Sequence, residues 1–251
     1  MNAQPIKIGI LGAHGKIGQW ISALIRADAG KTLILEAEVD SGHALDPLMT
    51  SDVVIDFASV EAMLSLAQYS LACQASGTGS LPCFVIGSTG WTPAARKTIE
   101  NLALKTPVLM ASNFSTGVLA LEEILRQAQP LLNKLGYAPV LVETHHRHKK
   151  DAPSGTALQI QKILSPDRPE EVQTHCVRAG EIIGEHQVVY YGVADQIEIT
   201  HRAQDRSAFA RGALDAAIWL GSEHRAGRLT PDSSSGSAVL GMERFFKARF
   251  H

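Results

Sequence analysis

The chain of 251 residues is poor in cysteine, in aromatic side chains and in excess charge of either sign, and it has no long apolar run. Three cysteines without paired spacing do not make a disulfide framework, so we expect reduced, buried thiols. No apolar segment reaches the ~18 residues that a membrane span needs, and no secretory signal pattern is visible. A net charge of −2 argues against a general nucleic-acid surface. We therefore expect a cytoplasmic protein without membrane or nucleic-acid partners.

The remaining composition is that of an ordinary globular enzyme. Hydrophobic residues make up 45% and charged residues 19% of the chain. This length suits one large domain or two smaller ones. The one low-complexity patch, Ser233–Ser237, is expected to be a surface loop.

Apolar strand patterns alternate with helix patterns through the first half of the chain. This order predicts an α/β domain with a Rossmann-like, doubly wound parallel sheet, whose ligands bind at the carboxyl ends of the strands. A first helix follows Ile17, with an apolar face of Ile17, Trp20, Ile21, Leu24 and Ile25. The other predicted elements are strands at Ile6–Leu11, Leu33–Val39, Asp52–Phe57, Cys83–Gly87 and Val108–Ala111, and helices at Val60–Cys73 and Pro93–Leu104.

A glycine-rich turn joins the first strand to the first helix, and an acidic residue, Asp40, ends the second strand. This order is typical of a dinucleotide-binding unit, in which glycines admit the pyrophosphate and the carboxylate binds the ribose hydroxyls. A plain connection and a solvated carboxylate are the alternatives. Ser41 stands where a reader of the 2′-phosphate often has arginine, which favours NADH, although Lys16 leaves NADPH open. The predicted cofactor residues here are Gly12, Ala13, His14, Gly15, Lys16, Ile17 and Asp40.

The second half contains an unusual basic segment, Glu143–Ala157, between a predicted strand at Pro139–Val142 and a predicted helix at Ser154–Leu164. Ser154 is a good N-cap, and first-turn N–H groups at a helix start bind anions. Histidine titrates near neutrality, so His145 or His146 can transfer a proton. Together these groups suit a small dianion that is protonated during a reaction.

Other interpretations of this basic segment stay open on residue types alone. It is also compatible with a solvated surface, or with a phosphate or nucleic-acid patch. The His-X-X-His spacing of His145 and His148 is compatible with zinc, although no cysteine is near and the adjacent cations oppose a metal ion. We expect no metal.

Glu143–Ala157 resembles the signature of the dihydrodipicolinate (4-hydroxy-tetrahydrodipicolinate) reductase family, Glu-X-His-His-X-X-Lys-X-Asp-Ala-Pro-Ser-Gly-Thr-Ala, at every fixed position. The resemblance implies an NAD(P)H-dependent reductase of diaminopimelate and lysine biosynthesis that acts on a small cyclic dicarboxylate. It implies that His145 donates the proton and that Lys149 assists protonation and binding. It also implies that the substrate carboxylates bind to His146, Ser154, Gly155 and Thr156.

Two loops of the first half resemble cofactor segments of the same family. They add Gly87, Ser88, Thr89, Ala111, Ser112, Asn113 and Phe114 to the expected cofactor site. Simple turn chemistry is the alternative for both loops.

The resemblance also implies the domain organisation and a homotetramer. We expect a dinucleotide-binding domain at 1–114 and a substrate-binding and oligomerisation domain at 115–220, with the tail from about 221 to 251 returning to the first domain. The second domain is expected to be α+β with a mixed sheet. Its predicted elements are helices at Ser115–Leu132 and Ser207–Leu220 and strands at Thr174–Arg178, His186–Tyr191 and Gln196–His201.

Two other functions share part of this pattern. Another two-domain NAD(P)-dependent oxidoreductase, acting on a small carboxylate or a sugar, would share the first half and differ at the basic segment. A nucleotide-sensing regulator would need a surface for a partner or for DNA, and the sequence shows no basic stripe of that kind.

Overall fold

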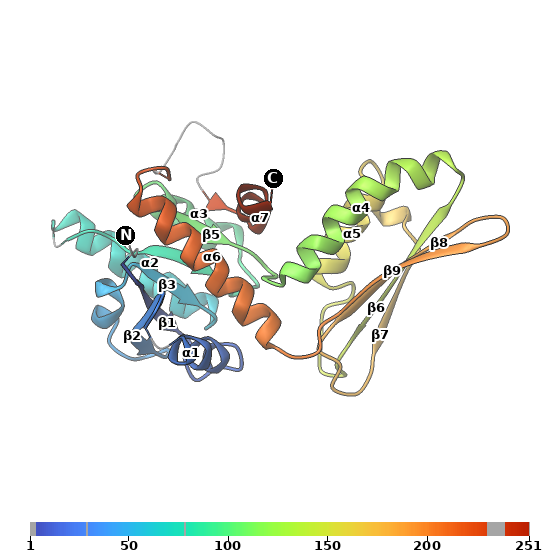
Figure 1. The fold of residues 1–251 in the computed structure, drawn as a ribbon. Helices are drawn as coiled ribbons and strands as arrows, with labels where there is room; N and C mark the ends of the chain where they lie inside the picture. Colours follow the sequence, from blue (N-terminus) through green and yellow to red (C-terminus); the bar gives the residue numbers. More distant parts are fainter. Residues whose placement is uncertain (1–3, 29, 78, 230–238, 251) are drawn as a thin grey trace. The chain divides into compact units, whose positions relative to one another are not determined.

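The computed structural model describes residues 4–28, 30–77, 79–229 and 239–250. The chain divides into two compact units, one formed by Met1–Phe114 with Phe209–His251 and the other by Ser115–Ala208 (Figure 1). The serine-rich patch at 233–237 lies outside the described residues.

The first unit is built on a parallel sheet with the strand order β10-β5-β4-β3-β1-β2. The central strands are almost wholly buried and rich in valine and isoleucine, as strands covered on both faces are. The Rossmann-like prediction is thereby confirmed. The strands are β1 (Ile6–Leu11), β2 (Leu33–Val39), β3 (Val53–Asp56), β4 (Cys83–Ile86), β5 (Val108–Met110) and β10 (Val239–Leu240).

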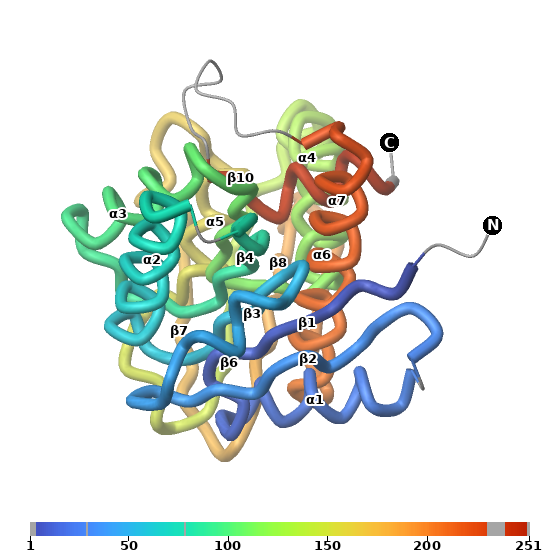
Figure 2. The backbone as a smooth tube through the Cα atoms, turned by 90° about the vertical axis from the view of Figure 1, so that its left-hand side faces the viewer, coloured from blue at the N-terminus to red at the C-terminus, as the bar shows by residue number. Residues whose placement is uncertain are grey.

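Helices pack on both faces of this sheet. Figure 2 shows α2 and α3 together on one side, with α1 and α6 on the other. One core joins Met63 and Leu66 of α2 and Ile99 of α3 to Phe84 and Val54 of the sheet. The helices are α1 (Gly18–Ala27), α2 (Val60–Ala75), α3 (Pro93–Ala103), α6 (Ser207–Arg225) and α7 (Met242–Phe250), with a 3₁₀ turn η1 (Asp46–Thr50).

Helix α1 has a narrower buried face than the sequence pattern predicts. Ile21 and Ile25 are buried against the sheet, whereas Trp20 is 42% exposed. Ser22, next to Ile21, is also buried, and its hydroxyl donates a hydrogen bond to Glu38 Oε1 of β2 at 2.6 Å. The expectation that Trp20 belongs to the apolar face was wrong: the buried residues of α1 are Gly18, Ile21, Ser22 and Ile25, and Trp20 lies about 160° around the helix from Ser22, on the exposed side.

Helix α6 lies for most of its length with the first unit, whereas the sequence-based domain boundary assigned it to the second up to Leu220. Two close approaches explain the difference. A Cβ on Gly212 would stand 1.7 Å from the carbonyl oxygen of Phe114, and one on Gly221 would meet Val53 at 2.9 Å. The small residues of α6 therefore fit it closely against the first sheet. The strand β10 also pairs with β5 of this sheet.

The second unit contains a mixed four-stranded sheet with the order β7-β6-β8-β9, as predicted. β6 pairs with β7 in parallel, whereas β6–β8 and β8–β9 are antiparallel. The strand predicted at Pro139–Val142 continues to His145, because the ladders with β7 and β8 run on past Val142. The strands are β6 (Ala138–His145), β7 (Thr174–Arg178), β8 (Glu185–Tyr191) and β9 (Gln196–Arg202).

Two helices, α4 (Thr116–Lys134) and α5 (Gly155–Leu164), cover one face of this sheet (Figure 1). Their apolar side chains meet the sheet in one core that includes Leu125, Ile160, Leu141, Val188 and Tyr190. Ser115 and Ser154 cap the two helices by accepting the N–H groups of Val118 and Ala157 at 3.3 and 3.2 Å. A short 3₁₀ turn, η2 (Pro169–Glu171), follows α5.

The three cysteines are free of disulfides, but they are not uniformly buried. Cys83 is buried and Cys73 half-buried, whereas Cys176 is exposed on β7. The expectation of buried thiols was therefore wrong for Cys176, which lies on the strand at the edge of its sheet. Among the described residues, no helix combines the length and the apolar character that crossing a membrane requires.

Candidate active site

The glycine turn (Gly12–Gly18) leaves β1 in a conformation that only small residues permit. Gly12 has φ +87°, and a Cβ there would stand 2.8 Å from the backbone nitrogen of Ala58. A Cβ on Gly18 would stand 2.1 Å from the carbonyl oxygen of Gly12. These contacts keep the turn close to the strand ends, so that its backbone can approach a ligand. Of the other predicted turn residues, Ala13 is buried, Gly15 and Ile17 are half-buried, and His14 and Lys16 are exposed.

Asp40 lies directly after β2 and contacts the glycine turn. Its Oδ1 accepts the backbone N–H of His14 at 3.1 Å, and its Oδ2 contacts the His14 imidazole Nδ1. The hydrogen bond with Asp40, and then its charge, raises the pKa of His14, and the same hydrogen bond lowers the pKa of Asp40. The His14 side chain is 87% exposed, so this contact lies at the surface of the turn.

The other predicted cofactor loops leave the same edge of the parallel sheet. Gly87, Ser88 and Thr89 follow β4, and the segment Ala111–Phe114 follows β5. A Cβ on Gly87 would stand 2.5 Å from the ring of Phe57, and Phe57 contacts Phe114 edge to face at 5.6 Å. Buried Ser88 and Phe114 support the loops, whereas Thr89 and Ser112 are exposed and Ala111 and Asn113 half-buried.

Asp56 is a buried carboxylate at this edge that the sequence did not single out. It ends β3 and is fully buried, and its oxygens accept the Ser88 hydroxyl at 2.5 Å and the Ala58 N–H at 2.9 Å. Burial raises the pKa of Asp56 to about 6, although these hydrogen bonds act in the opposite direction. It therefore holds two ligand-edge loops in place and carries a buried charge above pH 6.

We predict that Asp56→Asn stabilises the protein at high pH. Because the folded pKa of about 6 lies above the ordinary aspartate pKa of 3.8, the stability that Asp56 contributes is complete below pH 3.8 and is lost as the pH rises through 6. The buried charge then costs up to about 3 kcal/mol at pH 8. Urea unfolding should show the variant more stable than the parent at pH 8, by a margin that shrinks toward pH 4.5.

Asp167 is an exposed carboxylate of the second unit, and Asp167→Asn serves as the control. Its free energy of unfolding should differ little from that of the parent at both pH values. An Asp56→Asn variant that is destabilised equally at pH 8 and pH 4.5 would show that hydrogen bonding, and not buried charge, dominates at this position.

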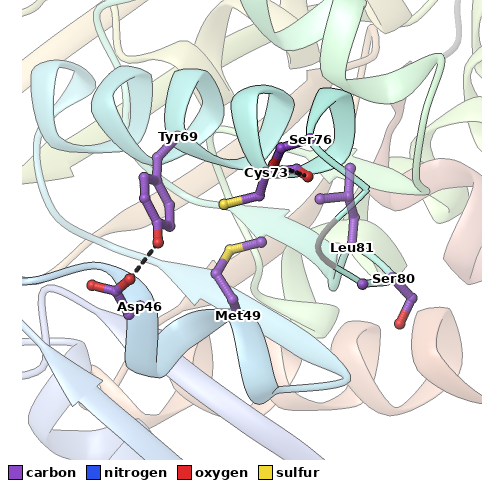
Figure 3. Close-up of a pocket in the computed structure, with 8 residues that line it drawn as sticks. Asp46, Met49, Tyr69, Cys73, Ser76, Ser80 and Leu81 are labelled. Atoms are coloured by element: carbon purple, nitrogen blue, oxygen red, sulfur yellow. Dashed lines mark hydrogen bonds between the residues drawn. The ribbon is translucent and has the colours of Figure 1, made fainter.

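The first unit also has a pocket of about 450 Å³, which none of the predicted cofactor loops lines (Figure 3). It is lined by η1, the end of α2 and the chain before β4, and Tyr69 donates a hydrogen bond to Asp46 across it. These segments precede β3 and β4, so the pocket lies at the amino ends of the strands, the edge opposite to the one where ligands of such sheets bind. It contains no predicted site residue.

The second unit brings part of the basic segment together around a buried carboxylate–imidazole cluster, which consists of Glu143, His145 and His186. Glu143 and His145 point to the helix-covered face of β6, and His186 pairs with Glu143 from β8. The His145 Nδ1 lies 3.2 Å and the His186 Nε2 3.9 Å from Glu143 Oε2. The two rings meet edge to face at 5.2 Å. Burial first, and His145 second, lower the pKa of His186 to about 3, so this ring is neutral at pH 7.

Lys149 and the start of α5 lie in the segment that follows this cluster. The Lys149 ammonium is 23% exposed and lies 2.9 Å from Asp151 Oδ1. Ser154 is buried, its N–H donates to Glu143 Oε1 at 3.1 Å, and its hydroxyl lies 3.3 Å from His186 Nε2. Gly155 and Thr156 form the first turn of α5, whose N-terminus favours anions.

The remaining basic residues divide into two groups. His146 is half-buried, and its pKa is lowered by burial first and by the charge of Arg206 second. Arg147 and His148 are exposed, and both lie about 4 Å from Glu181 on the surface. The solvated-surface interpretation therefore describes Arg147 and His148, whereas His145 is buried.

Glu143, His145 and His186 are the candidate metal ligands of the described residues, since their ligand atoms lie within 4.8 Å of one another. His148, the partner that the sequence spacing suggested for zinc, is not among them. The Arg178 guanidinium lies 2.8 Å from Glu143 Oε1, so a metal ion would share this carboxylate with a fixed cation. We therefore still predict that no metal ion binds here, because the carboxylate of Glu143 is already paired with Arg178.

The segments that contain Arg178 and His186 resemble family segments, but sequence reasoning gave neither residue, nor Glu143, a role in the site. The signal for Glu143 was available, because Glu143 and His145 are two apart on a strand and so share a face. Arg178 and His186 reach the cluster through strand register, in which Arg178 pairs with His145 and His186 with Glu143. Register between strands far apart in sequence is set by tertiary packing, so no local pattern shows it.

Known proteins match the chain along nearly its whole length. Models of the dihydrodipicolinate reductase N-terminus and C-terminus match residues 6–114 and 117–231. The 4-hydroxy-tetrahydrodipicolinate reductase of Anaeromyxobacter dehalogenans is 36% identical, over 85% of this chain and 92% of that protein. The one from Oleidesulfovibrio alaskensis is 35% identical, over 89% and 96%.

A solved structure shows the same fold. It is a dipicolinate-bound dihydrodipicolinate reductase from Paenisporosarcina sp. TG-14, with a TM-score of 0.65 at 20% identity, covering 87% of this chain and 95% of that one. The two family models together cover most of the chain, and the curated relatives exceed 30% identity. The chain therefore belongs to the dihydrodipicolinate reductase family.

Proposed function

We propose that this protein reduces 4-hydroxy-tetrahydrodipicolinate to tetrahydrodipicolinate with NAD(P)H, a step of diaminopimelate and lysine biosynthesis. The observation that carries the proposal is the second unit's combination of a buried Glu143–His145 pair with Lys149 and the helix start at Ser154. These are the groups needed to bind a dianion and to protonate it. The curated relatives bear the name of this reductase.

The substrate is a cyclic dicarboxylate, and the second unit offers cationic and N–H donors for its two carboxylates. The first turn of α5, at Gly155 and Thr156, provides backbone donors and the positive end of a helix. Lys149 supplies a full charge, with Asp151 as its partner until substrate arrives. The Paenisporosarcina relative has dipicolinate, a compound of this class, bound. In this chain we propose that His146 and Ser154 also bind the carboxylates.

His145 is the proposed proton donor. The 4-hydroxyl group leaves as water, which gives a ring whose C4 is part of a carbon–carbon double bond conjugated with the C=N bond. When bound, NAD(P)H would supply a hydride to C4 of this ring. The electron pair that this hydride displaces within the ring must then be neutralised by a proton. An imidazole is the side chain best suited to deliver that proton near neutral pH. Lys149 stabilises the negative charge before the proton arrives.

The first unit fits a dinucleotide, because the glycine turn leaves room that any Cβ at Gly12 or Gly18 would fill. We propose that NADH is preferred. The Asp40 carboxylate would repel a 2′-phosphate, and Ser41 offers no cation to it. The exposed Lys16 in the turn works in the opposite direction and keeps NADPH usable.

The assay that tests this function follows cofactor oxidation at 340 nm with the cyclic dicarboxylate, with simple amino acids and with sugars. We expect turnover with the dicarboxylate alone, and a kcat/KM for NADH about 10-fold above that for NADPH, the effect of about 1.4 kcal/mol of charge repulsion. Ser41→Arg should reverse the preference. Turnover of an amino acid or a sugar, or none at all, would reject the assignment.

We also propose a homotetramer assembled in the cytoplasm. The face of the second sheet that α4 and α5 leave uncovered presents apolar side chains, including Val177 and Tyr191 at 41% and 48% exposure. Exposed apolar residues on a sheet face favour self-association. Light scattering on the protein used for the assay should give about four times the 27.0 kDa chain mass, and a monomer mass would contradict this part.

A further inference from the structure

Glu143 contacts both the proposed proton donor and the start of the anion-binding helix. It is fully buried on β6. Its Oε1 accepts the N–H of Ser154 at 3.1 Å and the Arg178 guanidinium at 2.8 Å. Its Oε2 faces His145 Nδ1 at 3.2 Å. One oxygen of the carboxylate therefore contacts the helix start at Ser154, and the other contacts the proposed proton donor His145.

The contact between Glu143 and His145 brings together two buried polar atoms that need a hydrogen-bond partner. Glu143 Oε2 and His145 Nδ1 are both buried, and neither has another hydrogen-bond partner within the described part of the chain. Buried polar atoms are rarely left unpaired, and 3.2 Å is within hydrogen-bonding reach after a slight ring rotation. An ionised carboxylate is an acceptor only, so the hydrogen must lie on Nδ1.

We propose that Glu143 is a positioning residue, which fixes His145 with its hydrogen on Nδ1 so that the transferable proton is on Nε2, and which ties this ring to the helix start at Ser154. The proposal rests on the proposed function and extends it to a residue that does not touch the substrate.

The charge state of Glu143 supports this role. Burial acts to raise its pKa, but hydrogen bonds with His145, Ser154, Arg178 and Cys176 together outweigh burial, and the pKa falls well below its usual range. Glu143 is therefore an anion across the neutral pH range. Arg178 compensates this charge and also donates to the Asp151 carbonyl at 2.6 Å, which links the carboxylate to the loop that carries Lys149.

The proton transfer balances without a change of tautomer. The His145 imidazolium carries hydrogens on both ring nitrogens. Its Nε2–H bond breaks as the new bond to the substrate ring forms, and the electron pair of the broken bond stays on Nε2. The product is neutral imidazole with its hydrogen on Nδ1, the tautomer that Glu143 already holds. Uptake of one proton from solvent at Nε2 restores the donor.

Nitrogen NMR of histidine-labelled protein tests the arrangement without turnover. The spectrum is recorded at a pH where the rings are neutral, and the His145 signals are identified by their loss in His145→Gln. We expect the wild-type His145 to have its hydrogen on Nδ1 and an unprotonated Nε2. The opposite tautomer in the wild type would overturn the proposal, whether or not any variant folds.

A set of variants tests the functional consequence. Glu143→Gln keeps an oxygen for Ser154 but presents an amide to His145. We expect kcat to fall about 10–100-fold, as when other ring-orienting partners are removed, with a much smaller change in the Kd for pyridine-2,6-dicarboxylate. Glu143→Asp should recover part of kcat. Glu170→Gln, the same change at an exposed position of this unit, is the control and should match the wild type.

Two outcomes distinguish a failure of this inference from a failure of the proposed reductase function. If Glu143→Gln keeps wild-type kcat, or loses dicarboxylate binding in proportion to kcat, Glu143 does not act through His145. If the wild type shows the expected tautomer but does not reduce the cyclic dicarboxylate, the proposed function is wrong and the positioning of His145 still stands.

Discussion

Replacing His145 or Lys149 by alanine is expected to lower kcat by about 10²–10⁴-fold, the usual contribution of a general acid and its assisting charge. His145 is buried beside Glu143, and Lys149 is largely covered and paired with Asp151. Without the imidazole, the proton must come from water. Without the ammonium, the negative charge on the substrate ring is less stabilised. Steady-state kinetics with NADH and the cyclic dicarboxylate measure both effects.

The same segment offers matched controls, His148 three residues after His145 and Lys150 next to Lys149. His148 is 73% exposed at its side chain, where it lies near surface Glu181 and the ring of His146, and Lys150 is exposed. His148→Ala and Lys150→Ala should therefore keep kcat within a few-fold of wild type. If they are as damaging as His145→Ala and Lys149→Ala, the segment acts through its general positive charge. Near-normal turnover in both test variants would refute their assigned roles.

Gly12→Ala is expected to destabilise the first unit by about 2–5 kcal/mol and to abolish dinucleotide binding. Two terms contribute. An L-residue at φ +87° is strained, and the new Cβ would stand within 2.9 Å of backbone atoms of Phe57 and Ala58. Because backbone cannot rotate away as a side chain can, the turn must move off the strand ends. Urea unfolding and NADH fluorescence titration measure the two consequences.

Gly136→Ala is a control that has the backbone strain of Gly12→Ala without its steric clash. Gly136 has φ +82°, close to that of Gly12, but a Cβ there meets nothing within 4 Å. This control should lose only the strain term, about 1–2 kcal/mol, and should bind NADH normally. Equal destabilisation by the two substitutions would mean that the close packing of the glycine turn is unimportant.

Local sequence patterns predicted the parts of this fold that depend on local physics. The strand, glycine turn, helix and acid of the first unit follow from Gly12, Gly18 and Asp40, because each residue type meets a backbone or charge requirement at its own position. The N-cap at Ser154 was placed correctly for the same reason, and α5 starts at Gly155.

The features that were missed depend on packing between distant segments. Arg178 and His186 join the cluster through the register of β7 and β8 with β6. Asp56 looked like an ordinary strand end, yet Ser88, 32 residues later, bonds to it. The assignment of α6 failed because the contacts of Gly212 and Gly221 with the first sheet leave no periodic trace. Family resemblance supplied the reductase chemistry, which no residue pattern alone shows.

The central claim is that the dinucleotide turn of one unit and the proton-donating dianion site of the other serve one reaction. Calorimetric titration of NADH, with and without saturating pyridine-2,6-dicarboxylate, tests it most directly. The account predicts that the dicarboxylate tightens NADH binding by about 5–150-fold, with the reciprocal effect of NADH on the dicarboxylate. Lys149→Ala should remove this coupling. Unchanged NADH affinity at saturating dicarboxylate, or no dicarboxylate binding at all, would contradict the account.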